Sequence, residues 1–418
     1  MKIAVIGAGI AGNVAAWHLQ REGHDITVFE AGSHVGGHTH THQIDGHAID
    51  TGFIVFNDRT YPNFVRLLDT LGVASQPSSM SFSVRNDESG LEYNGSGFST
   101  LFAQRRNLVR PSFYRMLADI VRFNREAPRL LATPGSRTLG DFLRESRFSR
   151  EFIRDYLVPM GAAIWSTDPA RMLAFPAQFF VRFLHNHGML SIDDRPQWRV
   201  IRGGSARYVE KLAAPFRHRV RLNTPVRSVR RFPWEVRVDG ERFDYAFIAC
   251  HADQALAMLS DASALEREVL GAIGYQENEA VLHTDTSLLP RRRGAWAAWN
   301  YHVLPGRLGP VALTYNMNIL QNLQARETYC VTLNRTGDID PARVRRRMVY
   351  HHPLFTPAAV EAQKRHAEVN GVQRTYYCGA YWRFGFHEDG VMSALAALRH
   401  FHARRTHEGP AVLRAARA

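Results

Sequence analysis

The chain of 418 residues is 45% hydrophobic and 22% charged, which excludes a disordered or disulfide-scaffold class and favours a folded globular protein. Its length exceeds one ordinary core, so two lobes are expected, and no apolar run approaches the roughly eighteen residues of a membrane-spanning helix. The net charge of +13, almost all of it arginine, favours attraction to an anionic surface such as phospholipid headgroups, and without a recognisable binding motif it does not favour nucleic acid.

Residues 2–30 predict a strand, a tight turn, a helix and a second strand, as at the start of a dinucleotide-binding unit. Gly7 permits the tight turn, Gly9 lets a pyrophosphate approach the backbone, and Gly12 lets helix and strand pack closely. The helix N-terminus then offers free N–H groups to the phosphates. Glu30 ends the second strand, where its carboxylate can accept hydrogen bonds from both hydroxyls of an adenosine ribose.

A histidine-rich stretch follows, in which residues 34–47 hold five histidines beside a glycine pair. If residues 38–42 form a strand, three imidazoles project from one face, so a metal site is a geometric alternative. No cysteine lies close by in the sequence to complete such a site, and we expect no metal.

The same stretch carries a resemblance to a known family. Glu30, then Gly36-Gly37-His38, then Asp50-Thr51-Gly52 resemble a motif of the flavin-containing amine oxidase superfamily, which includes phytoene desaturases and protoporphyrinogen oxidase. The resemblance implies FAD as cofactor, with Gly36, Gly37 and His38 beside its pyrophosphate and ribityl chain. It also implies an α/β fold, α+β overall, in which a Rossmann-like FAD-binding domain is joined to a substrate domain.

Residues 76–200 are largely helical in pattern. Within them, residues 111–131 place apolar groups on one side and Arg115, Arg122, Arg125 and Arg129 on other faces. Such a stretch suits docking on an anionic membrane surface, and packing against a sheet is the alternative.

Residues 201–251 predict a glycine turn, a helix and several short alternating strands. They resemble the superfamily segment that returns to the nucleotide domain, where the backbone near Val226 would contact the adenine side of FAD. Residues 266–372 alternate as antiparallel strands do.

These patterns together predict a discontinuous FAD-binding domain made of residues 1–75, 200–265 and 373–405. Residues 76–199 and 266–372 then form a substrate domain, an antiparallel sheet with a helical cap, and residues 406–418 form a C-terminal tail.

Residues 376–398 predict a strand that ends at Gly379 and a helix that begins near Gly390. In the family such a helix directs its N-terminus at the flavin pyrimidine, and the position matching Met392 gives a backbone N–H to a ring carbonyl. A helix N-terminus stabilises the negative charge of a reduced flavin.

This segment departs from the family at Ala380, where an acid usually contacts the ribityl chain. Asp389 or Glu388 is the candidate for that contact. Non-covalent FAD is expected, because Cys378 occupies a backbone strand position rather than the family's attachment sequence. The three cysteines are odd in number and widely spaced, which predicts reduced thiols in a cytoplasmic protein, peripheral on the inner membrane face if it docks there.

The densest aromatic and imidazole grouping spans residues 299–302 and 381–387. Its members Trp299, His302, Tyr381 and His387 are the candidates to face the flavin, with either histidine as a base at neutral pH. Core packing is the alternative for each of them.

None of the three lysines, Lys2, Lys211 and Lys364, lies in a strand matching the lysine with which the family's amine oxidases promote the reaction with oxygen. A dehydrogenase or desaturase that passes its electrons elsewhere is therefore expected.

Five short segments between residues 276 and 390, among them AWAAWNYH and HHPLFTP, resemble a bacterial branch of the superfamily. This branch is similar to the flavoprotein-like N-terminal half of plant cyclopropane fatty acid synthases, and its members commonly accompany lipid-methylating enzymes. The resemblance implies dehydrogenation of a methylated or otherwise modified lipid acyl chain, with a lipid methyltransferase as a partner. Two alternatives stay open: an amine oxidase acting on a small amine or polyamine, and a non-catalytic lipid carrier of the same fold.

Overall fold

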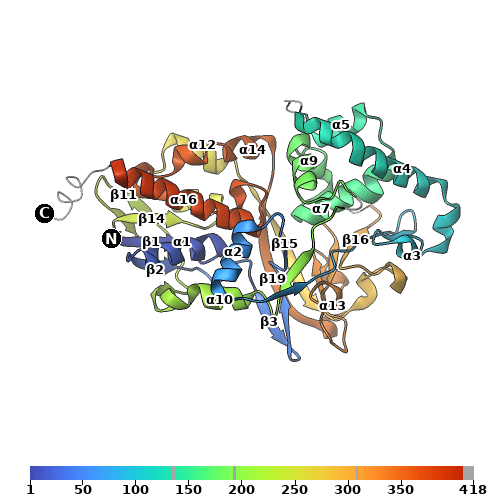
Figure 1. Cartoon of the computed structure of the whole chain (residues 1–418), viewed down its shortest axis with the longest axis horizontal. Helices are drawn as coiled ribbons and strands as arrows, with labels where there is room; N and C mark the ends of the chain where they lie inside the picture. The colour runs from blue at the N-terminus through green and yellow to red at the C-terminus, as the bar shows by residue number, and fades with distance from the viewer. Residues whose placement is uncertain (133–134, 136, 192–193, 307–308, 408–418) are drawn as a thin grey trace.

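The structure, a computed structural model, describes residues 1–407 except 133–134, 136, 192–193 and 307–308. Two lobes lie side by side, with the N-terminus and α16 (His387–His407) in one and α4 (Pro111–Glu126) in the other (Figure 1). The predicted α/β fold, α+β overall, is confirmed. Of the predicted C-terminal tail, residues 408–418 lie outside the described residues.

The first lobe, called the nucleotide lobe, is built on a parallel sheet in the order β10-β2-β1-β14-β20. Its strands are nearly continuous apolar runs, because a parallel sheet covered on both faces buries every side chain. The bounds are β1 (Lys2–Ile6), β2 (Asp25–Phe29), β10 (Val220–Arg221), β14 (Tyr245–Ile248) and β20 (Thr375–Tyr377).

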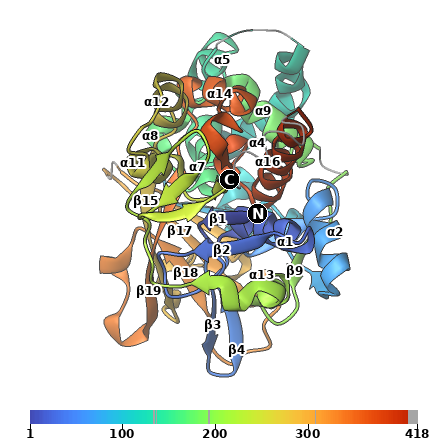
Figure 2. The same ribbon diagram turned by 90° about the vertical axis from the view of Figure 1, so that its left-hand side faces the viewer.

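Helices cover one face of this sheet, and a small antiparallel sheet with further helices covers the other. Figure 2 views the lobe from its outer side. On the first face lie α16 with α1 (Ile10–Arg21), α2 (Pro62–Leu71) and α10 (Ala206–Ala213). On the second lie β11 (Val229–Arg231), β12 (Val236–Val238), β13 (Glu241–Phe243), α11 (Ala252–Met258), α12 (Ala264–Gly271), α14 (Pro357–Gln363) and α15 (His366–Val369).

The second lobe, called the substrate lobe, has a seven-stranded sheet in the order β19-β15-β18-β17-β16-β7-β8. Neighbouring strands are antiparallel except β16 and β7, which are parallel. The bounds are β7 (Phe82–Asn86), β8 (Leu91–Asn94), β15 (Tyr275–His283), β16 (Trp299–Val303), β17 (Leu313–Asn316), β18 (Cys330–Leu333) and β19 (Val344–Pro353). Residues 76–200 were expected to be largely helical, so β7 and β8 are additions that extend the sheet.

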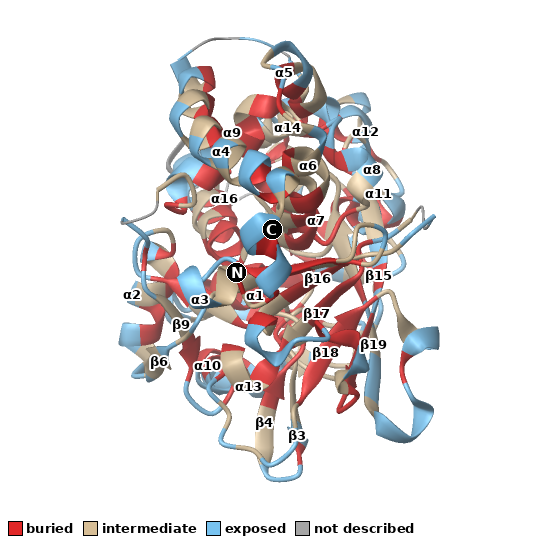
Figure 3. Ribbon diagram, turned by 90° about the vertical axis from the view of Figure 1, so that its right-hand side faces the viewer, coloured by how far each residue is buried: buried red, intermediate tan, exposed pale blue. Residues whose placement is uncertain are grey.

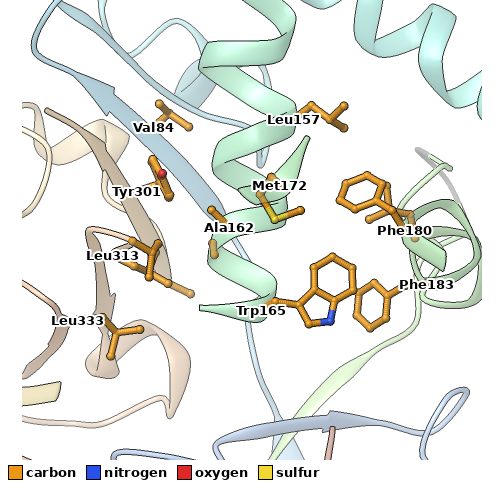
Figure 4. Packing of buried hydrophobic residues seen from close by; sticks show 14 of the residues in the cluster. Val84, Leu157, Ala162, Trp165, Met172, Phe180, Phe183, Tyr301, Leu313 and Leu333 are labelled. Carbon is orange, nitrogen blue, oxygen red and sulfur yellow. The ribbon is translucent and has the colours of Figure 1, made fainter. Parts of the chain in front are cut away.

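A helical cap packs on one face of this sheet. In Figure 4, Ala162 and Trp165 of α7 (Val158–Trp165) lie between sheet residues such as Leu313 and the phenylalanines Phe180 and Phe183 of α9 (Ala177–Asn186). The other cap helices are α3 (Phe98–Leu101), α5 (Leu139–Glu145), α6 (Arg150–Phe152) and α8 (Pro169–Met172), with a π-helical turn at Ile153–Leu157. In the described part of the chain, no helix is both long and apolar enough to cross a bilayer.

Short elements join the lobes. The hairpin of β3 (Thr41–Ile44) and β4 (His47–Asp50) follows the glycine pair, and β5 (Val55–Asn57), β9 (Trp198–Ile201) and β6 (Ser75–Pro77) form a three-stranded sheet. The small helix α13 (Met317–Leu320) follows β17. Packing places the lobe boundaries near residues 274 and 356 rather than 265 and 372, because α12, α14 and α15 contribute to the nucleotide-lobe core.

Candidate cofactor and active site

The first turn of the nucleotide lobe depends on two glycines. Gly7 has a φ of 102°, and a Cβ there would lie 2.8 Å from the carbonyl oxygen of Ala249. A Cβ on Gly12 would lie 1.8 Å from the carbonyl oxygen of Gly7. The tight turn and the close helix packing predicted for these positions are therefore both present.

Gly9 differs, because a Cβ built on it would meet no atom within 4 Å. The glycine pair lies beside this open space: Gly36 N–H donates to the Ala8 carbonyl at 2.8 Å, and a Cβ on Gly37 would approach the Cα of Gly9 to 3.1 Å. The first turn of α1 carries no acidic residue and no side-chain cap. Its N–H groups are thus available to an anion such as a pyrophosphate.

Glu30 lies at the end of β2 beside this turn. Its carboxylate accepts the N–H groups of Ala8 at 2.8 Å and Gly32 at 2.7 Å. Each oxygen keeps a further lone pair for a ribose hydroxyl. The loop that contains Val226 runs beside it, since Thr224 N–H donates to the Glu30 carbonyl at 2.8 Å. This arrangement suits the adenine side of a dinucleotide.

His38 lies among aromatic rings that the sequence did not single out. Its ring centroid is 5.2 Å from Tyr350, 5.6 Å from His352 and 6.0 Å from His251. Burial lowers the pKa of His38, and burial with neighbouring imidazoles lowers the pKa of His251 and of His352 to about 3. These neutral imidazoles can each donate and accept one hydrogen bond. In the sequence, the adjacent His351 and His352 near the end of β19 were the available signal for this group of rings.

The other histidines of the loop form a stack. His40 lies 4.1 Å from His34 and 4.1 Å from His42, centroid to centroid, and burial lowers the pKa of His40 to about 4. Across the residues that the structure describes, no group of three His, Cys, Asp or Glu side chains is arranged to hold a metal ion. The absence of a metal stays an expectation.

Asp50 fixes the hairpin that follows. Its carboxylate accepts hydrogen bonds from Thr41, from the N–H and hydroxyl of Ser205, and from the Gln321 amide at 2.9 Å. Gln321 belongs to the substrate lobe, so this buried carboxylate ties the two lobes together beside the histidines.

The last helix begins earlier than the sequence predicts. α16 starts at His387 rather than near Gly390, because Asp389 accepts the N–H of Phe386 at 2.9 Å and closes the first turn there. Gly390 N–H already donates to the Phe386 carbonyl at 3.1 Å. Met392 therefore lies inside the hydrogen-bonded helix, and the free N–H groups belong to residues 387–389.

The two acids of this turn have protein partners. Glu388 accepts the N–H groups of Asn63 and Phe64 at the start of α2. Asp389 forms an ion pair with Arg383 at 3.3 Å, and burial raises its pKa to about 7. The ribityl contact expected of Asp389 or Glu388 in place of Ala380 stays a prediction. Gly379 is held against α16 by its N–H, which donates to Ser393 Oγ at 2.8 Å.

The structure does not bring the predicted catalytic grouping together. His387 lies in the nucleotide lobe, stacked on Phe53 with ring centroids 3.6 Å apart, and its Nε2 is 2.6 Å from the Tyr208 hydroxyl. That hydroxyl is 2.6 Å from Thr39 Oγ1. Burial lowers the pKa of His387 well below its usual value, so the imidazole is neutral.

His302 lies elsewhere, on the sheet face away from the cap. Its Nε2 is 2.8 Å from Asp87 and its Nδ1 is 2.5 Å from Arg335. Burial, with the nearby guanidiniums, lowers its pKa to about 4. Its neighbour Tyr301 packs on the opposite face, because side chains alternate along a strand. His302 and His387 thus have different surroundings, and which of them serves as the base stays a prediction.

Trp299 and Tyr381 lie in different lobes. Trp299 packs in the substrate lobe, with its ring 5.0 Å from Tyr315, whereas Tyr381 is buried in the nucleotide-lobe core. A Cβ on Gly379 would lie 2.3 Å from the Tyr381 ring, so this tyrosine borders the cofactor region. Among the described residues, neither the Tyr381 hydroxyl nor Trp299 Nε1 has a hydrogen-bond partner. An unpartnered buried hydroxyl beside Gly379 fits a polar cofactor chain.

Comparison with known proteins classifies the chain. A model of the family described as flavin containing amine oxidoreductase matches residues 10–301. The chain belongs to this family.

Among curated relatives of the flavin amine oxidoreductase, AofH of Mycobacterium tuberculosis, a candidate flavin-containing monoamine oxidase, is 27% identical over 244 residues, 55% of this chain and 51% of that protein. The chain thus spans about half the length of this relative. Cyclohexylamine oxidase from Brevibacterium oxydans superimposes with a TM-score of 0.70 at 17% identity, over 97% of this chain and 99% of its own. A fatty acid isomerase from P. acnes reaches 0.67 at 18% identity, over 95% and 98%. At such identities the structural likeness shows the shared fold.

FAD is the cofactor that membership of this family implies. The loop and helix end around Gly9, Gly37 and Glu30, called the cradle, fit this cofactor. The open space at Gly9, the free N–H groups of α1 and the carboxylate of Glu30 meet the pyrophosphate and ribose requirements. The three cysteines are free, and burial raises the pKa of Cys250 to about 12 and that of Cys378 further. A neutral buried thiol is a poor nucleophile, which supports non-covalent attachment.

The lysines of this oxidoreductase all lie outside the cradle. Lys2 pairs with Glu241 at 2.9 Å, Lys364 pairs with Glu361, and Lys211 donates to the Gly72 carbonyl at the end of α2. Weak reaction of the reduced cofactor with oxygen therefore stays a prediction.

Proposed function

We propose that this protein is an FAD-dependent dehydrogenase that acts on an acyl chain of a membrane phospholipid, with methylated or otherwise modified chains as its substrates. The observation that carries the proposal is the aromatic contact between the cap and the start of α16. Phe179 lies 4.8 Å from Phe384, and Phe183 lies 4.9 Å from Phe386. Packed apolar rings thus connect the substrate lobe to the start of α16, and an acyl chain would find apolar surroundings there.

The buried acids give the second support. Each of the seven buried acidic side chains in the described part of the chain already accepts hydrogen bonds from the protein, so none of these seven is an unpartnered carboxylate waiting for a substrate ammonium. They are Asp50, Glu92, Asp155, Glu266, Asp285, Glu388 and Asp389. An uncharged acyl chain needs no such partner.

Dehydrogenation removes a hydride and a proton from neighbouring carbons. FAD bound here would supply the hydride acceptor, and a side chain of this protein would have to take up the proton. A neutral imidazole can do so, and His387 is neutral at the start of α16. Tyr208 and Thr39 connect it to the glycine-pair loop by hydrogen bonds of 2.6 Å each.

Of the two alternatives, one has specific support and the other does not. Amine oxidation is favoured by the relative AofH and by cyclohexylamine oxidase, which shares the fold. A non-catalytic lipid carrier would need no cofactor, which the open space at Gly9 argues against. The fatty acid isomerase with the same fold makes an acyl chain compatible with this architecture.

Deleting the gene in its host and comparing total fatty acids by mass spectrometry tests the proposal. We expect a saturated species to accumulate that is two hydrogens heavier than a missing product. Restoring the gene should reverse the change, and a variant that cannot bind FAD should not. Identical lipid profiles in all strains would contradict the proposal.

A further inference from the structure

Exposed apolar side chains gather at the outer end of the substrate lobe. Of the eight large hydrophobic residues that are exposed in the described chain, five lie between residues 98 and 121. Three of them, Phe98, Val109 and Val121, are 76%, 82% and 61% exposed. The other two are Leu108 and Tyr114. Apolar exposure gathered in this way marks an interaction site.

The fold holds these side chains on one rigid surface. α4 buries Phe113, Met116 and Phe123 on its inner face, so Tyr114 and Val121 project outward one above the other along the helix. The Tyr114 hydroxyl donates to the Leu108 carbonyl at 2.9 Å and fixes the 3₁₀ turn Arg105–Val109 against the helix. Figure 3 views the molecule from this end.

The same segment carries exposed arginines, namely Arg105, Arg106, Arg115 and Arg125, of which Arg115 and Arg125 pair with Glu151 and Glu126. Residues 98–132 contain seven arginines and two acids. A second basic run, residues 291–293, comes from a distant part of the chain and lies beside it, since a Cβ on Gly294 would lie 3.4 Å from the Cβ of Ala103. Glu92 accepts the N–H groups of Arg291 and Arg292 and holds the run in place. All three arginines of this run are exposed.

We propose that this face, called the docking surface and made of the exposed apolar residues of 98–121 with the arginines of 105–125 and 291–293, binds the surface of an anionic phospholipid bilayer. Apolar side chains enter the headgroup boundary while guanidiniums bind phosphate oxygens. Charge complementarity selects the bilayer as occupant, because two basic segments remote in sequence converge around one apolar group. For its biological role the docking surface rests on the proposed function, since a phospholipid substrate must be taken from a membrane.

Vesicle flotation of the full-length, FAD-loaded protein tests the docking surface. The probes are vesicles of phosphatidylcholine alone and of phosphatidylcholine with phosphatidylglycerol. Wild type should float with the anionic vesicles and lose binding as salt rises. Val109→Glu and Arg292→Glu should each lower the partition coefficient by about tenfold or more. Phe98→Ser is a second apolar variant in case Val109→Glu fails to fold.

Matched controls come from the edge strand β19, the other place where an exposed valine lies among arginines. Val349, 53% exposed, and Arg347 receive the same changes, Val349→Glu and Arg347→Glu. Both controls should float like wild type. Loss of binding in the β19 variants but not in Val109→Glu would overturn the proposal. The proposal would also be overturned if wild type does not bind anionic vesicles but dimerises through this face in sedimentation experiments.

The test separates this proposal from the proposed function. Val109→Glu should still dehydrogenate phospholipid dispersed in detergent micelles if the proposed function holds. Binding of wild type to vesicles without any turnover of lipid would leave the docking surface intact and contradict the proposed function alone.

Discussion

At the scale of single residues, a substitution at Gly9 can test cofactor binding without affecting folding. A Cβ at this position meets no protein atom within 4 Å, and the residue has an ordinary φ of −72°. Gly9→Ala should therefore leave the thermal midpoint of the apoprotein unchanged while the bound flavin falls, because the methyl group takes the place of the pyrophosphate. Flavin absorbance per mole of protein and a thermal melt measure the two effects.

Two other glycines provide the comparison. Gly337→Ala, also in open space, should change neither property. Gly12→Ala should prevent folding, since its Cβ would lie 1.8 Å from the Gly7 carbonyl oxygen. Full flavin content in Gly9→Ala would argue against the placement of the pyrophosphate.

The hydroxyl of Tyr208 tests the role of His387. Tyr208→Phe removes the hydroxyl that bridges His387 and Thr39 and leaves only their direct contact of 3.5 Å, so flavin reduction by substrate should slow by roughly tenfold to a hundredfold, with FAD content unchanged. His387→Ala should slow the same step. Stopped-flow absorbance under anaerobic conditions measures it. Tyr93→Phe, which removes a buried hydroxyl in the substrate lobe, is the control. Unchanged reduction in both test variants would remove His387 from the mechanism.

Residues that are constrained by their immediate neighbours could be predicted from the sequence. The fingerprint glycines and Glu30 could be assigned because turn geometry and helix packing are local. The catalytic grouping could not, since Tyr301 and His302 are adjacent in sequence but lie on opposite faces of one strand. The ring neighbours of His38 come from chain positions far away, and no local pattern connects them.

At the scale of elements, a buried ion pair joins α12 to the nucleotide-lobe sheets. Arg231 of β11 donates to Glu266 at 2.9 Å and to Asp261 at 2.8 Å, and the arginine and Glu266 side chains are 0% and 1% exposed. Tyr377 of β20 also donates to Glu266. Glu266→Ala should lower the free energy of unfolding by about 3–5 kcal/mol, because it leaves a buried guanidinium with fewer partners.

Urea denaturation followed by circular dichroism measures this loss. Glu268→Ala, in the same helix, removes an exposed partner of Arg365 and should leave the unfolding midpoint nearly unchanged. Equal midpoints for the two variants would show that the buried pair does not hold α12.

Helix periodicity predicted α4 and strand alternation predicted most of the substrate sheet, because both patterns follow from burial on one side. The start of α16 was missed by three residues, since a hydrogen bond from Phe386 to Asp389 decides it and no periodicity reports that bond. β7 and β8 were not predicted, because each is short and the pair joins the sheet only through β16, which pairs with β7 and lies far along the chain.

At the scale of the whole molecule, buried neutral histidines make stability depend on pH. Burial lowers the pKa of seven histidines to about 3 or 4, compared with 6.5 when exposed: His40, His187, His251, His283, His302, His352 and His366. Between these values the unfolded chain binds more protons than the folded one, so stability is present above pH 6.5 and is lost as pH falls. Burial raises the pKa of Asp50 to about 6 and that of Asp389 to about 7. These two groups favour the folded state as pH falls, but they are fewer than the histidines.

The free energy of unfolding should therefore decrease by several kcal/mol, on the order of one per shifted proton, between pH 7 and pH 5. Thermal melts in matched buffers at constant ionic strength measure this. A thermal midpoint that stays level over that range would mean that the histidines are exposed or paired in solution.

The two-lobed plan with a discontinuous FAD-binding domain could be predicted, because the glycines of residues 7–12 and the last helix both indicated the same cofactor. The exact boundaries could not, since α12 and α14 join the nucleotide lobe only through tertiary packing of residues such as Val269 and Ala359. The docking surface likewise could not be predicted without the fold, because it combines residues 98–125 with the basic run of residues 291–293, which is remote in sequence.

Anaerobic mixing of the FAD-loaded protein with detergent-dispersed phospholipid or with amines shows whether a lipid acyl chain reduces the FAD. We expect phospholipid to bleach the flavin and to yield an acyl chain two hydrogens lighter by mass spectrometry, while cyclohexylamine and putrescine leave the flavin oxidised. Bleaching by an amine together with a flavin that stays oxidised in the presence of every phospholipid would contradict this expectation.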